Sequence, residues 1–238
     1  MDLGIHVAKT IKIGNFELWI TESMVNAWLI GIVLIIIALI IRKTILNPKK
    51  IPSGVQNVIE WIVELLDNFT TSTMGEHGMK FSSFYGGMFV FILLCNLSGL
   101  LIGPKFDDGN FSIGFLRPPT ADAAVTFALA LITFFMIQGY GIKSKGVLKW
   151  AKGLTEPMWP MTPLNIIGEL ANPISLSFRL FGNILGGTII MGLYYNLPWP
   201  ALIGLPTALH GYFDVFAGVL QAFIFVMLSM TFVSSAMD

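Results

Sequence analysis

The chain has 238 residues, of which 55% are apolar and only 12% are charged, and its 14 basic and 14 acidic side chains cancel. Soluble proteins carry roughly a quarter charged residues, so this composition excludes a soluble globular domain. A net charge of zero provides no basic surface for nucleic acid, which we exclude as a partner. The composition predicts an all-α polytopic membrane protein, with residues 1–238 forming a single membrane domain in contact with lipid.

The amino-terminal residues 1–23 lack the basic beginning of a signal peptide, so we expect them to be an outer segment of the mature protein. The lone cysteine, Cys95, lies in an apolar run, where it can form no disulfide within the chain and has no companion for a metal site. We therefore expect neither a metal nor a cofactor.

The first predicted span covers residues 24–41 and is followed by Arg42 and Lys43. Residues 54–71 differ, because apolar side chains at helical spacing face one side and acidic or amide side chains face the other. This pattern predicts an interfacial amphipathic helix. Since its polar face is acidic, anionic lipid would not hold it, and we expect it to pack against neighbouring spans.

Residues 81–103 and 121–142 are the second and third predicted spans. Two longer apolar segments follow at 162–195 and 207–236, separated by a loop rich in proline and glycine. They would reach about 50 Å and 45 Å along a helix axis, against a hydrocarbon core of about 30 Å, so they must tilt or kink. The sequence thus predicts about five membrane-crossing helices and one interfacial helix, with the last two spans forming a long tilted hairpin.

The distribution of basic residues predicts the orientation. With the amino terminus outside and the carboxyl terminus in the cytoplasm, nine basic residues lie inside and four outside, as the positive-inside rule requires. The inner set is Arg42, Lys43, Lys49, Lys50, Lys80, Lys143, Lys145, Lys149 and Lys152, and the outer set is Lys9, Lys12, Lys105 and Arg117. The fourteenth, Arg179, lies within a span.

An ionisable side chain in hydrocarbon costs roughly 2.5–3.5 kcal/mol on insertion scales, so each one calls for a partner or a function. Four occur in the last two spans: Glu169, Arg179, His210 and Asp214. Arg179 is too far from either end of its helix to reach water, and Glu169 lies about 15 Å away on another helix face, so the two cannot pair. A guanidinium can repel a cation or attract a carboxylate, but it cannot pass on a proton.

Polar side chains approach the arginine from both sides of the membrane. In an antiparallel hairpin, Asn183, His210 and Asp214 lie on its outer side, Glu169 lies on its inner side, and Gln221 lies at its level, where the two should meet. This pattern predicts two aqueous half-paths separated by a fixed positive charge. Ions would cross the gap on an acidic group of a partner protein, because this chain has no free carboxylate at the arginine's level.

Two sequence runs resemble the signature helices of the a subunit of F-type rotary ATP synthases of the bacterial type. They are Pro-Ile-Ser-Leu-Ser-Phe-Arg-Leu-Phe-Gly-Asn at 173–183 and Leu-Gln-Ala-Phe-Ile-Phe at 220–225. The order of spans, the interfacial second helix, the Thr120-Ala121-Asp122 helix start and the final hairpin extend the resemblance over essentially the whole chain. The resemblance implies a multi-pass stator subunit in the membrane Fo sector of the cell inner (plasma) membrane. Such a subunit is not an enzyme on its own, but couples the flow of protons or Na+ to ATP synthesis.

The resemblance also implies that Arg179 faces the carboxylates of a rotating c-subunit ring and prevents a short circuit between two offset half-channels. Asn183 and Gln221 would support the arginine, and the complex would add peripheral-stalk b subunits and the F1 catalytic head as partners. Many bacterial members carry a glutamate nine residues after the arginine and a histidine or glutamate at the position of Asp214. This chain has Thr188 and Asp214 there, so we hypothesise that its outer relay rests on Asp214 with His210.

Each candidate also has a purely structural interpretation. Arg179 could belong to a buried ion pair, Glu169 could pair with the inner basic cluster, and Asn183 and Gln221 could simply bridge helices. His210 and Asp214 could bond only to each other or to backbone. Asp122, at the start of the third span, is better explained as a helix N-terminal charge than as an ion ligand.

Two other functional classes compete with the rotary interpretation. A stand-alone secondary transporter or channel would need its own central site and usually an internal repeat, and the sequence contains no such repeat. A membrane-embedded hydrolase would need a catalytic constellation such as HExxH, which does not occur.

Overall fold

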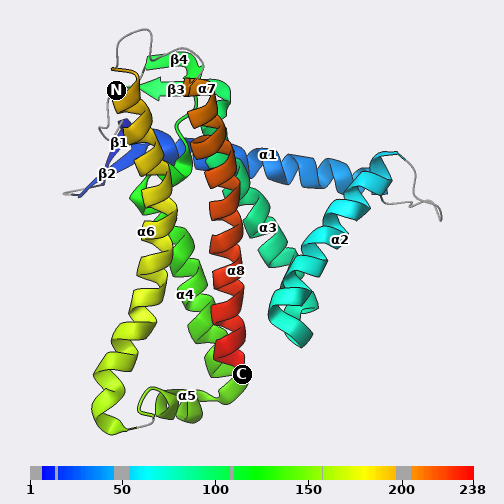
Figure 1. Ribbon diagram of the computed structural model, residues 1–238, viewed down its shortest axis with the longest axis vertical. Helices are drawn as coiled ribbons and strands as arrows, with labels where there is room; N and C mark the ends of the chain where they lie inside the picture. Colours follow the sequence, from blue (N-terminus) through cyan, green and yellow to red (C-terminus); the bar gives the residue numbers. More distant parts are fainter. Residues whose placement is uncertain (1–6, 14–15, 46–53, 108–109, 157, 197–204) are drawn as a thin grey trace.

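The computed structural model describes residues 7–13, 16–45, 54–107, 110–156, 158–196 and 205–238. Among them, five helical segments are long and apolar enough to cross a membrane, which confirms the predicted all-α polytopic membrane fold (Figure 1). They are Glu22–Lys43, Val55–Leu100, Ala123–Lys145, Trp159–Tyr194 and Ala208–Met237.

Two short β-hairpins, which the sequence analysis did not predict, accompany the helices. Strands β1 (Val7–Ile13) and β2 (Phe16–Thr21) pair antiparallel directly before the first helix. Strands β3 (Ile102–Asp107) and β4 (Asn110–Phe115) pair antiparallel after the second span, near α7 in Figure 1. The end of the predicted span 81–103 therefore belongs to a strand, because the backbone there bonds across a hairpin and not along a helix.

The first three helices follow one another along the chain, and the third of them joins the central bundle. Helix α1 (Glu22–Ile45) is followed by the amphipathic helix α2 (Val55–Met74), and a sharp turn leads into α3 (Gly78–Leu97). At this turn a Cβ added to Gly78 would lie 2.4 Å from the Cα of Thr71, so only glycine permits so close an approach.

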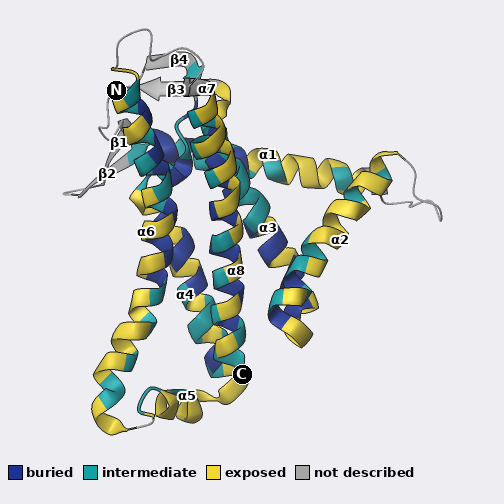
Figure 2. Cartoon of the chain, in the orientation of Figure 1, coloured by how far each residue is buried: buried dark blue, intermediate teal, exposed yellow. Residues whose placement is uncertain are grey.

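Helix α2 packs against the spans, as its acidic polar face led us to expect. The ring of Phe69 stacks on Phe223 of α8 at 4.9 Å and meets Phe89 of α3 edge-on at 6.3 Å. The remainder of α2 is largely exposed, and Figure 2 shows burial concentrated at its end next to α3.

The centre of the fold is a bundle of α3, α4 (Ala123–Lys145), α6 (Thr162–Tyr194) and α8 (Ala217–Met237). Side chains such as Tyr85, Leu180 and Phe225 are fully buried between these helices (Figure 2). Small hydroxyl residues also join them: the hydroxyl oxygens lie 3.1 Å apart in the pair Thr126–Ser177 and 2.9 Å apart in the pair Thr133–Ser229. Such hydrogen bonds satisfy polar groups where lipid offers no water.

The last two spans form a long hairpin. Helix α6 has 33 residues, or about 50 Å at 1.5 Å per residue, and it encloses Pro173. The returning arm consists of α7 (Leu205–His210), a π-helical segment (Gly211–Phe216) and α8. In Figure 1, α1 runs across the direction of this hairpin. The two therefore cannot both stand upright in one bilayer, and the predicted tilt of the hairpin stays a prediction.

Candidate functional site

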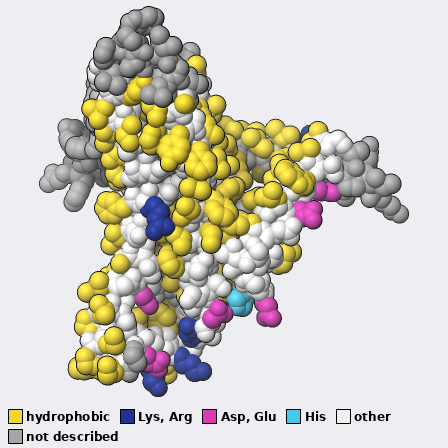
Figure 3. Space-filling model, viewed as in Figure 1, with side chains coloured by type: hydrophobic (Ala, Val, Ile, Leu, Met, Phe, Trp, Pro, Cys, Tyr) yellow, Lys and Arg dark blue, Asp and Glu magenta, His cyan; other side chains and the backbone are white. Residues whose placement is uncertain are grey.

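Arg179 lies near the middle of α6 and is exposed on the surface of the hairpin, together with Ser175, Phe178 and Gly182. It is the only lysine or arginine in this helix, and Figure 3 shows basic colour partway along α6 on a mostly hydrophobic face. In the described parts of the chain, no acidic side chain forms an ion pair with it. The arginine thus presents an unneutralised charge on a mostly hydrophobic surface, which is typical of a face that contacts lipid or another protein.

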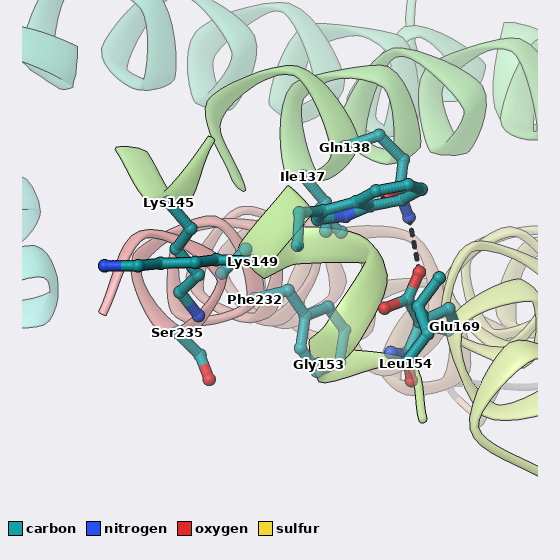
Figure 4. Close-up of a pocket in the computed structure, with 12 residues that line it drawn as sticks. Ile137, Gln138, Lys145, Lys149, Gly153, Leu154, Glu169, Phe232 and Ser235 are labelled. Atoms are coloured by element: carbon teal, nitrogen blue, oxygen red, sulfur yellow. Dashed lines mark hydrogen bonds between the residues drawn. The ribbon is translucent and has the colours of Figure 1, made fainter. Parts of the chain in front are cut away.

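A cavity of about 300 Å³ lies where the hairpin and α4 meet the short helix α5 (Val147–Gly153), and we call it the inner cavity because the sequence predicts that this end faces the cytoplasm. Glu169 lines this cavity, and its Oε2 accepts a hydrogen bond of 2.8 Å from Nε2 of Gln138 (Figure 4). The indole Nε1 of Trp150 donates to Oε1 of Gln138 at 3.1 Å. Lys145 and Lys149 also line the cavity, so a carboxylate and two cationic groups share this space.

A second cavity of about 180 Å³, which we call the outer cavity, lies at the opposite end of the hairpin. Asn183 of α6 lines it together with His210 and Asp214 of the opposite arm. His210 Nδ1 lies 2.5 Å from Oδ2 of Asp214, and its Nε2 lies 2.7 Å from the hydroxyl of Tyr195. Asp214 belongs to the π-helical segment, and such segments inside α-helices are frequent at functional sites.

Asn96 of α3, which is not among the site residues predicted from the sequence, also lines the outer cavity. Its Nδ2 donates to the carbonyl of Gly218 at 2.7 Å, and its Oδ1 accepts from the hydroxyl of Thr120 at 2.8 Å. It therefore joins three segments of the fold. An asparagine inside an apolar span was the only available sequence signal.

Among the residues that the structure describes, the two cavities have no lining residue in common. Along α6, the inner cavity reaches Asn172 and the outer cavity begins at Asn183, which is about 16 Å farther along the axis. Arg179 lies between these positions and lines neither cavity. The hairpin therefore has a recess containing polar side chains at each end and an exposed positive charge between them.

Gln221 and Arg179, which the sequence predicts to meet, differ in their exposure. Gln221 is only 7% exposed and lies within the helix packing, whereas Arg179 is exposed, and no hydrogen bond joins the two in the described structure. The Nε2 of Gln221 and the Nδ2 of Asn183 are both buried without a hydrogen-bond partner among the described residues. The expectation that the two side chains meet therefore stays a prediction.

Asp122 has the structural role expected of a charge at the N-terminus of the third predicted span. It caps α4, because its Oδ1 accepts from the backbone N–H of Ala124 at 2.9 Å, and its Oδ2 accepts from the hydroxyl of Thr21 at 3.0 Å. The carboxylate thus joins the start of α4 to the end of β2.

Comparisons with known proteins give this constellation a context. The family model described as "ATP synthase A chain" matches residues 24–234. A relative from Propionigenium modestum, named ATP synthase subunit a, sodium ion specific, is 36% identical over 94% of this chain and 76% of its own length. ATP synthase subunit a of Trichlorobacter lovleyi is 34% identical over 91% of this chain and 87% of its own length. The subunit a of Staphylococcus aureus is 33% identical over 79% of each chain.

Proposed function

This chain belongs to the ATP synthase A chain family, and we propose that its two end cavities are separate ion half-paths, kept apart by Arg179. As a member of that family it is a multi-pass, non-catalytic subunit of the membrane Fo sector with an ion-conducting stator role. The proposal concerns which residues conduct ions and how the paths are separated.

In the proposed mechanism an ion enters one cavity and binds to a carboxylate of a rotating c-subunit ring. It is carried around the ring and leaves through the other cavity. Arg179 attracts the ionised carboxylate as it passes and repels any cation moving directly between the cavities. The observation that carries the proposal is the position of Arg179, exposed and without an acid partner among the described residues, between two cavities with no shared lining residue.

Named residues have separate roles in the two paths. His210 and Asp214 form the relay of the outer path, and Glu169 serves the inner path. Asn183 and Gln221 each have a buried amide N–H group without a partner in the described structure, which supports a role in binding water or a passing acceptor near the arginine.

The proposed setting is the cell inner (plasma) membrane, with the amino terminus outside and the carboxyl terminus in the cytoplasm. The end of α8 lies beside α5, next to the basic residues Lys145 and Lys149, which supports a cytoplasmic position for this end (Figure 1). The proposed partners are the c-subunit ring, peripheral-stalk b subunits and the F1 catalytic head. Purification from native membranes with these partners supports this setting, and recovery as an active stand-alone transporter or channel contradicts it.

The transported ion is proposed to be a proton or Na+. One relative is named as sodium ion specific, so both ions need to be tested in the assembled complex. Stimulation of ATP-driven pumping by Na+ at constant pH identifies sodium, and pumping in sodium-free medium identifies the proton.

Substitution of Arg179 tests the central proposal. In R179K, lysine keeps the positive charge but can lose its proton when desolvated, so coupled ATP synthesis should fall at least about tenfold. The measurement is ATP synthesis driven by an imposed ion gradient, with the amount of assembled complex checked in parallel. R42K, at the exposed end of α1, is the matched control and should retain synthesis. Normal coupled synthesis in R179K would contradict the proposal.

A further inference from the structure

We propose that Gln138, held by the indole of Trp150, is a positioning residue that keeps Glu169 from trapping ions in the inner cavity. The inference rests on the proposed inner half-path and adds to it a residue on α4 and another on α5. These two residues and Glu169 come from three different helices, line the cavity together and are linked by hydrogen bonds, of which Figure 4 shows the one between Gln138 and Glu169.

The chemistry of its two partners determines how the Gln138 amide is oriented. The indole N–H of Trp150 can only donate, so it requires the carbonyl oxygen of the amide. An ionised Glu169 can only accept, so it requires the amide NH₂ group. Rotating the amide by 180° would place two donors together on one side and two acceptors together on the other. Trp150 therefore maintains Gln138 as a fixed hydrogen-bond donor toward the carboxylate.

The location of this contact gives the fixed donor a function. On one side of the contact lies the inner cavity. Its charged lining residues are Glu169, Lys145 and Lys149, because α8 contributes only uncharged side chains to the lining. On the other side Gln138, Trp150 and Glu169 also border a groove of about 340 Å³, whose remaining lining is apolar. If the carboxylate turned into that groove, it would lose its polar partners, and the free energy of the ionised group would rise. The amide thus holds Glu169 at the boundary, facing the cavity.

A donor bound to Oε2 also competes with any cation for the same oxygen. The Gln138 amide therefore weakens the association between Glu169 and an ion and shortens its lifetime, which favours transfer over retention. Removing the donor should strengthen ion binding and slow ion release. Structural damage would have a different effect, because it would lower the maximum rate without lowering the half-saturating ion concentration.

The test uses the assembled ATP synthase in inverted membrane vesicles, where the inner face is open to the medium. The rate of ATP-driven pumping is measured against the concentration of the pumped ion, varied as pH in sodium-free medium or as NaCl at constant pH. In Q138M, which keeps the length of the side chain, we expect the half-saturating ion concentration to fall about 3- to 10-fold and the maximum rate to fall as well. W150F keeps an aromatic ring but no indole N–H, and it should produce a smaller shift in the same direction.

Two further variants complete the experiment. E169Q removes the charge, so its half-saturating concentration should rise, and adding Q138M to E169Q should produce no further shift, since the two residues act through one contact. Q56M removes a comparable contact on the exposed face of α2, where Nε2 of Gln56 donates to Glu60 at 2.7 Å, and serves as the matched control without a shift.

The outcomes separate this inference from the proposal on which it rests. An unchanged or raised half-saturating concentration in both Q138M and W150F, with the expected rise in E169Q, would overturn the role of Gln138 and leave the inner half-path intact. A shift by Q138M that persists in the E169Q background would also overturn it, because the amide would then act elsewhere. An E169Q complex that behaves like wild type would reject Glu169 as part of the inner path, and the inference with it.

Discussion

His210 Nδ1 lies 2.5 Å from Oδ2 of Asp214, four residues farther along the returning arm of the hairpin. The other ring nitrogen lies 2.7 Å from the hydroxyl of Tyr195, which extends from the end of α6. The imidazole is therefore bound on both sides: by the phenol of Tyr195, which follows α6, and by the carboxylate of Asp214, which lies on the same arm as His210. This arrangement joins the two arms and lines the outer cavity with groups that exchange protons or bind cations.

Replacing Asp214 tests whether this chain of groups conducts ions. In D214N the amide can neither ionise nor accept a proton, so ATP-driven ion pumping should fall by about tenfold or more. D214E retains a carboxylate and should pump faster than D214N. The measurement is pumping by equal amounts of assembled complex, and undiminished pumping in D214N would show that Asp214 only bonds locally.

Gly187 controls the packing at the wall of the outer cavity. A Cβ added to Gly187 would lie 3.2 Å from the Cβ of Phe213, and both residues line the cavity. In G187V the larger side chain should displace Phe213, narrow the cavity and reduce passive ion conduction several-fold.

The matched control for this change is G31V in α1, where an added Cβ meets nothing within 4 Å. It introduces the same residue into a spanning helix without a steric conflict, so conduction should be retained. Equal conduction in G187V and wild type, measured on vesicles with equal amounts of complex, would show that the outer cavity is not on the ion path.

Asp122 provides a stability prediction. D122A removes the cap of α4 and the bond from Thr21, so the protein should lose about 1 kcal/mol of stability while ion pumping per assembled complex is retained. D122N keeps a capping oxygen and should lose less. The measurement is the dissociation temperature of the purified complex. A loss of pumping in D122A at full stability would instead identify Asp122 as an ion ligand.

The sequence contained enough information to predict the membrane class and the main helices, because a continuous apolar run in lipid has few alternatives to an α-helix. The two β-hairpins escaped prediction. Strand pairing depends on a second segment, here the strand that follows almost directly in the chain, and β3 begins within the predicted span 81–103.

The candidate site was predictable in part. Charged residues within apolar spans stand out by composition, which drew attention to Arg179, Glu169 and Asp214. Gln138 and Trp150 did not stand out, because an amide and an indole are ordinary in a membrane helix and near an interface. Their significance depends on the hydrogen bonds that bring them to Glu169.

The sequence by itself determined two things. The chain lies in a membrane with a few ionisable residues inside its apolar runs, and a family signature surrounds Arg179. Both follow from local properties, namely transfer cost and the order of residues. Only the tertiary structure decided that the polar residues form two cavities with no common lining, that Arg179 is exposed while Gln221 is buried, and that Gln138 is bonded on both sides. These relations depend on the rotation and packing of helices against one another, which helical periodicity along a single segment does not specify.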